Sequence, residues 1–84
     1  MVKKILLLSN KQYIILYKFN ICTEEFTGID LFDVDFKKHI KNVQINELQD
    51  IVELPNGNYL ISTEEQIKIL DRINFKVKKI RSII

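Results

Sequence analysis

An internal repeat is the feature that most constrains the fold of this 84-residue chain. The segment ILLLSNKQYIILY at residues 5–17 returns, in looser form, 46 positions later as IVELPNGNYLIST at residues 51–63. Five of the thirteen aligned positions are identical: Ile5/Ile51, Leu8/Leu54, Asn10/Asn56, Tyr13/Tyr59 and Ile15/Ile61. We therefore expect one supersecondary unit written twice in a single domain 1–84, with repeat 1 at about residues 2–45 and repeat 2 at about 46–84.

Each repeat contains short apolar runs separated by turn residues, a pattern that predicts strands. In repeat 2 the pair Asn56-Gly57 can adopt the positive φ angles of a tight hairpin, and Pro55 stands where a missing N–H costs little. Farther along, residues 67–69 and 75–78 alternate apolar with charged side chains, which is the two-residue period of half-buried strands. Each repeat is thus expected to form four consecutive strands.

The repeat continues beyond the first hairpin. Residues 29–33 align with 67–71, and Phe36-Lys37 aligns with Phe75-Lys76. After one-residue gaps, the alignment pairs Lys38 with Lys78, Ile40 with Ile80, Lys41 with Arg81 and Val43 with Ile83. The spacing between the repeats shrinks because repeat 1 carries about eight extra residues near 20–27, as expected for a lengthened loop or hairpin between retained strands.

Residues 48–83 resemble a blade of a WD-repeat type β-propeller: a strand, an Asn-Gly turn, a second strand, an acidic turn, a third strand ending in Asp, and a basic outer strand. On this resemblance Leu70-Asp71 and Phe32-Asp33 take the place of the family's Trp-Asp pair, and Glu64 stands where a turn usually has Asp. The chain has no tryptophan and no Gly-His pair, so the hydrogen-bonded tetrad that braces typical blades does not carry over. The resemblance implies an all-β fold of two four-stranded antiparallel, propeller-blade-like meanders.

A helical interpretation of the C-terminal part stays open beside the strands. Residues 62–65 offer a capping box, apolar residues recur at three-and-four spacing from Ile67 to Ile84, and basic residues end the segment. The alternative fold is therefore α+β with a C-terminal helix near residues 63–82. The density of isoleucine argues for strands, and the corresponding segment at residues 28–36 has no helical stripe.

The composition offers neither a disulfide nor a structural metal site that would stabilise a domain of this size. The single cysteine, Cys22, has no intramolecular disulfide partner, and with the single histidine, His39, it falls short of a four-ligand metal site. We expect no cofactor and a reducing setting, cytoplasmic or otherwise intracellular. The apolar run at residues 5–8 is shorter than a signal-peptide core of about 7–15 residues or a membrane span of about 20, so a soluble chain without a targeting segment is expected.

No catalytic constellation is recognisable. Cys22 with His39 lacks a third group that would orient the histidine, and residues 30–35 lack the glycine and terminal glutamate of a calcium loop. We therefore expect no catalytic, cofactor-binding or metal-binding residue, no small-molecule substrate and no enzyme activity.

A basic cluster near the C-terminus is the remaining surface feature. A strand that places Lys76 and Lys78 on one side can contact phosphates, although lysines on an outer strand also deter pairing between sheet edges. The candidate partner-binding residues are Lys76, Lys78, Lys79 and Arg81, with Lys37, Lys38 and Lys41 in the matching place of repeat 1.

Two blades cannot close a ring, because repeat units need about three or more neighbours to bury their faces. The leading hypothesis is therefore a non-catalytic protein-interaction or assembly module completed by self-association or by a larger protein partner. The alternative is a small α+β protein that binds nucleic acid through its basic C-terminal segment; the net charge of +2 by itself favours neither.

Overall fold

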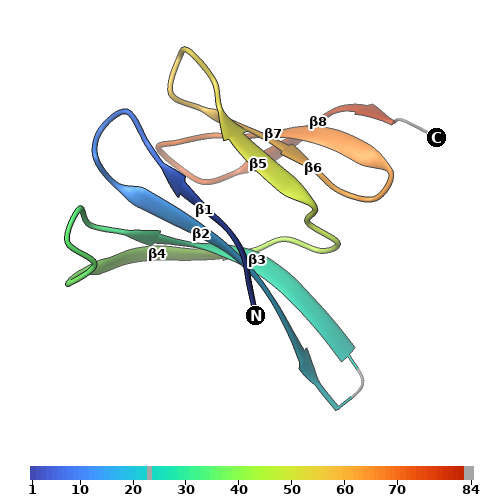
Figure 1. Ribbon diagram of the computed structural model, residues 1–84. Helices are drawn as coiled ribbons and strands as arrows, with labels where there is room; N and C mark the ends of the chain where they lie inside the picture. The colour runs from blue at the N-terminus through green and yellow to red at the C-terminus, as the bar shows by residue number, and fades with distance from the viewer. Residues whose placement is uncertain (23, 83–84) are drawn as a thin grey trace. The chain divides into compact units, whose positions relative to one another are not determined.

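Both halves of the chain form antiparallel β-meanders (Figure 1). The structure, a computed structural model, describes residues 1–22 and 24–82. The first sheet contains, in spatial order, β1 (Val2–Leu7), β2 (Tyr13–Ile21), β3 (Glu24–Phe32) and β4 (His39–Gln44). The second contains β5 (Asp50–Glu53), β6 (Tyr59–Ser62), β7 (Gln66–Leu70) and β8 (Val77–Ser82). The predicted all-β fold of two four-stranded antiparallel meanders is confirmed.

The chain divides into two compact units, Met1–Asn46 (unit 1) and Glu47–Ile84 (unit 2). Each unit holds one of the two sheets, and the division falls where the sequence places the junction between its two repeats.

The alternative C-terminal helix near residues 63–82 is wrong. Within the described part of the chain there is no helix, and this segment contains β7, a turn and β8. The residues that resemble a helix cap instead close the β6–β7 hairpin: the Thr63 N–H donates to the Gln66 carbonyl over 2.9 Å, and the Gln66 N–H donates to Thr63 Oγ1 over 3.2 Å. A threonine at a turn satisfies backbone groups in either structure, and here the isoleucine-rich continuation favours the strand.

The first hairpin of each unit has the same register and the same turn. Ile5 lies opposite Ile15 and Ile51 opposite Ile61, which preserves the 46-residue repeat. In both turns an asparagine Oδ1 accepts the N–H two residues later over 3.0 Å, from Gln12 to Asn10 and from Asn58 to Asn56. This local bond gives a structural reason for asparagine at both positions.

Each of these turns is a three-residue loop rather than the tighter one suggested by Asn56-Gly57. The N–H of Leu54 donates to the Asn58 carbonyl over 2.8 Å, and the N–H of Gly57 donates back to Leu54 over 2.9 Å. Only the last loop residue takes positive φ, 87° at Gly57 and 72° at Lys11. A type I turn followed by one left-handed residue has this geometry.

The extra residues of repeat 1 lengthen one hairpin. β2 and β3 have nine residues each, whereas β6 and β7 have four and five. Among the described residues, the backbone of β1 extends along β2 to Lys18, which bonds to Met1. On the other side of the hairpin, the chain after β4 extends along β3 to Thr27, which bonds to Ile45. The rest of the β2–β3 hairpin extends past the sheet as a two-stranded arm (Figure 1).

The expected alignment of the outer strands is wrong by several residues. Lys41 lies opposite Leu31, and Lys78 lies opposite Ile69, the residue that corresponds to Leu31. Lys41 therefore corresponds to Lys78 rather than to Arg81. The turns before the outer strands have the same length, residues 33–38 and 71–76, so the one-residue gaps that the sequence alignment places there have no counterpart in the structure. Each outer strand also skips one residue, Ile40 in β4 and Ile80 in β8, which changes the correspondence by one further residue between these two places.

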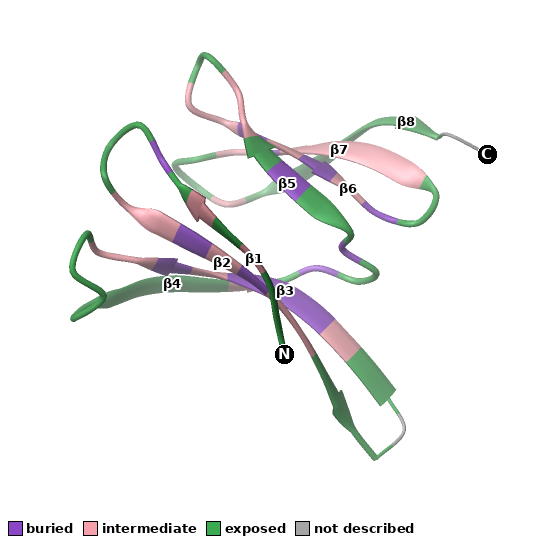
Figure 2. Cartoon of the chain, in the orientation of Figure 1, coloured by how far each residue is buried: buried purple, intermediate pink, exposed green. Residues whose placement is uncertain are grey.

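The two units bury opposite faces of the repeated sheet. Figure 2 marks the buried, intermediate and exposed residues along the strands of both units. Ile5 is 58% exposed, whereas Ile51, its counterpart in sequence and in register, is 1% exposed. In unit 1 the covered face consists of Ile14, Leu16, Ile29 and Leu31. In unit 2 the covered face consists of Ile51, Tyr59, Ile61 and Leu70, whose repeat counterparts Ile5, Tyr13, Ile15 and Phe32 lie on the other side of the first sheet.

This inversion predicts unequal costs for one conservative change at two matched sites. Ile51→Val should lower the free energy of unfolding by about 0.5–1.5 kcal/mol, because it removes a buried methyl group. Ile5→Val should change it by less than about 0.5 kcal/mol, because the side chain is exposed. Both variants keep a β-branched residue on an edge strand, so the difference in their free energies of unfolding in urea reports the difference in burial alone. Equal losses would contradict the finding that Ile51 is buried and Ile5 is exposed.

Candidate functional site

An apolar and aromatic surface covers the open face of unit 1. Leu7 lies opposite Tyr13, which lies opposite Phe32, and Ile5 lies opposite Ile15. Directly opposed residues point to the same side of a sheet. Leu7 is 56% exposed. We call this surface the unit 1 open face, formed by Ile5, Leu7, Tyr13, Ile15, Tyr17, Asp30 and Phe32.

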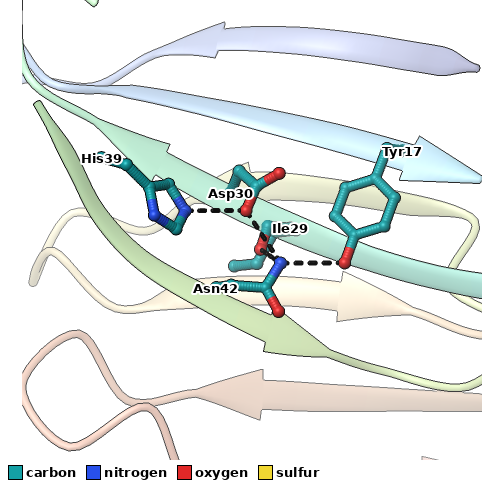
Figure 3. Close-up of polar contacts among 5 residues, drawn as sticks. All are labelled: Tyr17, Ile29, Asp30, His39 and Asn42. Atoms are coloured by element: carbon teal, nitrogen blue, oxygen red, sulfur yellow. Dashed lines mark hydrogen bonds and ion pairs between the residues drawn. The ribbon is translucent and has the colours of Figure 1, made fainter. Parts of the chain in front are cut away.

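A polar network crosses this face between β2 and β4 (Figure 3). Asn42 Nδ2 lies 2.9 Å from the Tyr17 hydroxyl and 2.8 Å from Asp30 Oδ1. Asp30 Oδ1 also lies 2.9 Å from His39 Nε2. The network places one carboxylate, held between Asn42 and His39, in the middle of an otherwise apolar and aromatic surface.

Gly28 makes room for Tyr17 in this network. Tyr17 lies opposite Gly28, and a Cβ at residue 28 would stand 2.7 Å from the tyrosine oxygen and 2.6 Å from the carbonyl oxygen of Val43. Glycine thus lets the tyrosine ring lie across β3 and reach Asn42 on β4.

Aromatic contacts occupy both ends of the unit 1 open face. At one end Phe36 stacks on Tyr13 with ring centroids 4.6 Å apart and contacts Phe32 at 5.6 Å. At the other end Phe19 stacks on Tyr17 at 5.7 Å and on Phe26 of the arm at 5.2 Å. The aromatic surface therefore continues from the sheet onto the arm.

Within the residues that the structure describes, the open face of unit 2 has no aromatic side chain and contains a hollow. Asp50 lies opposite Ser62 and Ser62 opposite Ile67, while Val52, Leu60 and Ile69 form the next row. These six residues are the unit 2 open face. A shallow hollow of about 180 Å³ opens on this unit, lined mainly by apolar atoms of Val52, Leu60 and Ile67 together with Ile51, Ile61, Asp50 and Ser62.

The predicted basic cluster does not form one surface. Lys76 lies in the turn before β8, so of the four residues only Lys78, Lys79 and Arg81 belong to this strand. Lys78 lies opposite Ile69 and Arg81 opposite Ile67, which puts both cations on the side of the unit 2 open face. Lys79 lies opposite Lys68 on the other side. In unit 1, Lys37 and Lys38 lie in a turn and only Lys41 belongs to a strand.

The nucleophile and base considered from the sequence lie far apart. Cys22 follows the end of β2, and His39 pairs with the opposite end of β3, about 25 Å away at the rise of an extended strand. Among the described residues, no three His, Cys, Asp or Glu side chains are placed to hold a metal ion. Asp33 and Asp35 instead accept backbone N–H groups of Val34 and Lys37 in their own turn.

The network of Tyr17, Asn42, Asp30 and His39 was not predicted from the sequence. Its members are separated along the chain and meet only through the register of three strands. The one available signal was Gly28, because a glycine inside a strand pattern indicates close approach of another group.

Comparison with known proteins adds no relative. A scan against protein-family models finds no match for this chain, and searches of curated proteins and of solved structures return none. Within the described residues, no helix has the length and apolar character needed to cross a membrane.

The fit of Tyr17 over Gly28 predicts a clear loss of stability for Gly28→Ala. The added methyl group must displace the tyrosine or the Val43 carbonyl, so the free energy of unfolding should fall by about 1–3 kcal/mol in chemical denaturation. Tyr17→Phe is the companion variant, because it removes only the hydroxyl bonded to Asn42 and should cost about 0.5–1.5 kcal/mol. A fully stable Gly28→Ala protein would show that Tyr17 does not lie across β3.

The turn at Asp71 predicts acid sensitivity. Its Oδ1 accepts the N–H of Ile73 over 2.8 Å and that of Asn74 over 3.1 Å, and these bonds, the first more than the second, lower the pKa of Asp71. Because the pKa of Asp71 is lowered in the folded protein, these bonds stabilise the turn fully at a pH above the ordinary carboxyl pKa of 3.8. This stabilisation is lost as the pH falls through the lowered pKa. A carbon-13 NMR titration should show Asp71 ionising below 3.8, whereas a value at or above it contradicts this geometry.

Proposed function

We propose that this chain is a non-catalytic interaction or assembly module, made of two propeller-like units whose open faces are completed by self-association or by a partner protein. One observation carries the proposal: each unit leaves one face of its sheet at least partly exposed, and both of these faces are largely apolar. An exposed apolar surface of this kind marks an interaction site on a soluble protein.

The energetic reason lies in the thinness of a single sheet. A four-stranded sheet has two faces, and a stable domain covers its apolar face with another layer. Here Leu7 on unit 1 remains 56% exposed and Val52 on unit 2 remains 42% exposed, although both lie in rows of apolar side chains. Burial of such rows releases about 25 cal/mol for each Å² of apolar surface, so a docking partner gains affinity wherever it covers them.

The propeller-like part of the proposal is supported by the order and chemistry of the strands. Each unit is a four-stranded meander whose outer strand, β4 or β8, is largely exposed; β8 carries Lys78, Lys79 and Arg81, whereas Lys41 is the only lysine in β4. Asp33 and Asp71, at the place of the second residue of the WD-family pair, both accept backbone N–H groups in the turn that follows the third strand. Each aspartate thus anchors the passage to the outer strand.

Nucleic-acid binding is less well supported. Phosphate contacts need cations gathered on one face, whereas Lys78 and Arg81 lie on one side of β8 and Lys79 lies on the other.

A cytoplasmic or otherwise intracellular location belongs to the proposal as well, because the exposed Cys22 forms no disulfide.

The proposal predicts that the purified chain does not persist as an ordinary monomer. At micromolar concentration, light scattering should give a mass above the 10.0 kDa of one chain, or else a monomer that binds an apolar dye and melts without a sharp transition. The physical reason is that the open faces either meet another surface or leave the sheets thinly supported. A monomer that melts cooperatively and ignores the dye would contradict the proposal.

A further inference from the structure

The two open faces are opposite sides of the same repeated sheet. On the unit 2 open face, Leu60 occupies the repeat position of Ile14, which is buried in unit 1. Ile67 and Ile69 likewise occupy the positions of Ile29 and Leu31, both buried in unit 1. The unit 2 open face is therefore the side that unit 1 keeps covered.

The converse holds for unit 1. On its open face, Ile5 and Ile15 occupy the repeat positions of Ile51 and Ile61, which are buried in unit 2. Tyr13 occupies the position of Tyr59, also buried. Each side of the repeated sheet is therefore covered in one unit and open in the other. A single chain leaves one copy of each side open.

Building on the proposed function, we infer that the partner is a second copy of this chain, docked head to tail. In this contact the unit 1 open face of one molecule lies on the unit 2 open face of the next. Each chain then carries one donor and one acceptor surface, so contacts of this kind propagate until they close into a ring. Rings of two, three or four chains would contain four, six or eight units.

Charge favours the head-to-tail contact over pairing of like faces. The unit 1 open face carries the Asp30 carboxylate, whereas Lys78 and Arg81 stand on the same side as the unit 2 open face. Pairing two unit 1 faces would bring together two copies of Asp30, and pairing two unit 2 faces would bring together the cations, which is unfavourable in both cases. The unit 2 open face also carries the carboxylate of Asp50, whose Oδ1 accepts a hydrogen bond from the Ile51 N–H over 2.8 Å.

Shape favours the same contact. The unit 2 open face offers the apolar hollow of about 180 Å³ beside Val52, Leu60 and Ile67. The unit 1 open face offers aromatic rings, including that of Tyr13, which stacks on the exposed Phe36 at one end of the face. Large aromatic side chains that fill apolar pockets are the usual anchors of protein interfaces.

The test uses one charged substitution on each face. Ile5→Glu places a carboxylate on the unit 1 open face, and Val52→Glu does so on the unit 2 open face; both positions are substantially exposed on edge strands. Ile73→Glu is the matched control, because Ile73 is 81% exposed in the turn between β7 and β8. In sedimentation velocity, the wild type and Ile73→Glu should form the same assembly, and each face variant should dissociate at least tenfold more readily.

Mixing the two face variants gives the decisive measurement. The Ile5→Glu chain keeps its unit 2 face and the Val52→Glu chain keeps its unit 1 face, so an equimolar mixture should form heterodimers that neither variant forms alone. Circular dichroism checks that each variant retains its strands. If one does not, Leu7→Glu replaces Ile5→Glu and Val52→Asp replaces Val52→Glu.

The remaining outcomes separate this inference from the proposed function. If only one face variant dissociates the assembly, or if mixing restores nothing, the head-to-tail contact is wrong while an assembly module remains. If the wild type is a dye-binding, poorly cooperative monomer, self-assembly is wrong and a different partner protein must complete the sheets. If the wild type is a cooperative monomer that ignores the dye, both proposals fail.

Discussion

The rest of the structure depends on the antiparallel register between the first two strands of each unit. Ile5 against Ile15 and Ile51 against Ile61 decide which side chains share a side of each sheet, since strand residues alternate between the two faces. The duplicated hairpin turns hold that register with the same backbone bonds and the same asparagine contact. This register therefore determines which residues form each of the two faces of each sheet.

The matched strands do not make the units equivalent. Unit 1 has a longer central hairpin, an aromatic surface and the polar network around Asp30, while unit 2 has shorter strands and an apolar hollow. These differences lie largely on the open faces, where unit 1 carries aromatic rings and unit 2 has a hollow. Divergence of two repeats in this complementary sense is what a directional, head-to-tail contact requires.

Much of the fold was predictable from local chemistry. Turn residues between apolar runs located the strands, and the repeat located the eight-residue insertion that became the β2–β3 arm. The errors came from features that satisfy more than one structure. Thr63 and its neighbours resemble a helix cap but close a hairpin. Matching Phe36 to Phe75 placed alignment gaps in two turns that have the same length, and the irregularities at Ile40 and Ile80 leave no mark in the sequence.

The sequence alone determined the strand order within each unit and the two-unit plan, because turn preference and strand periodicity act over a few residues. Only the tertiary structure decided which side of each sheet is covered. The run Tyr13 to Tyr17 is apolar or aromatic at every position, so its two faces cannot be told apart by pattern. Burial of Ile14 in one unit and of Ile61 in the other depends on long-range packing, and so does the meeting of Tyr17, Asp30 and Asn42.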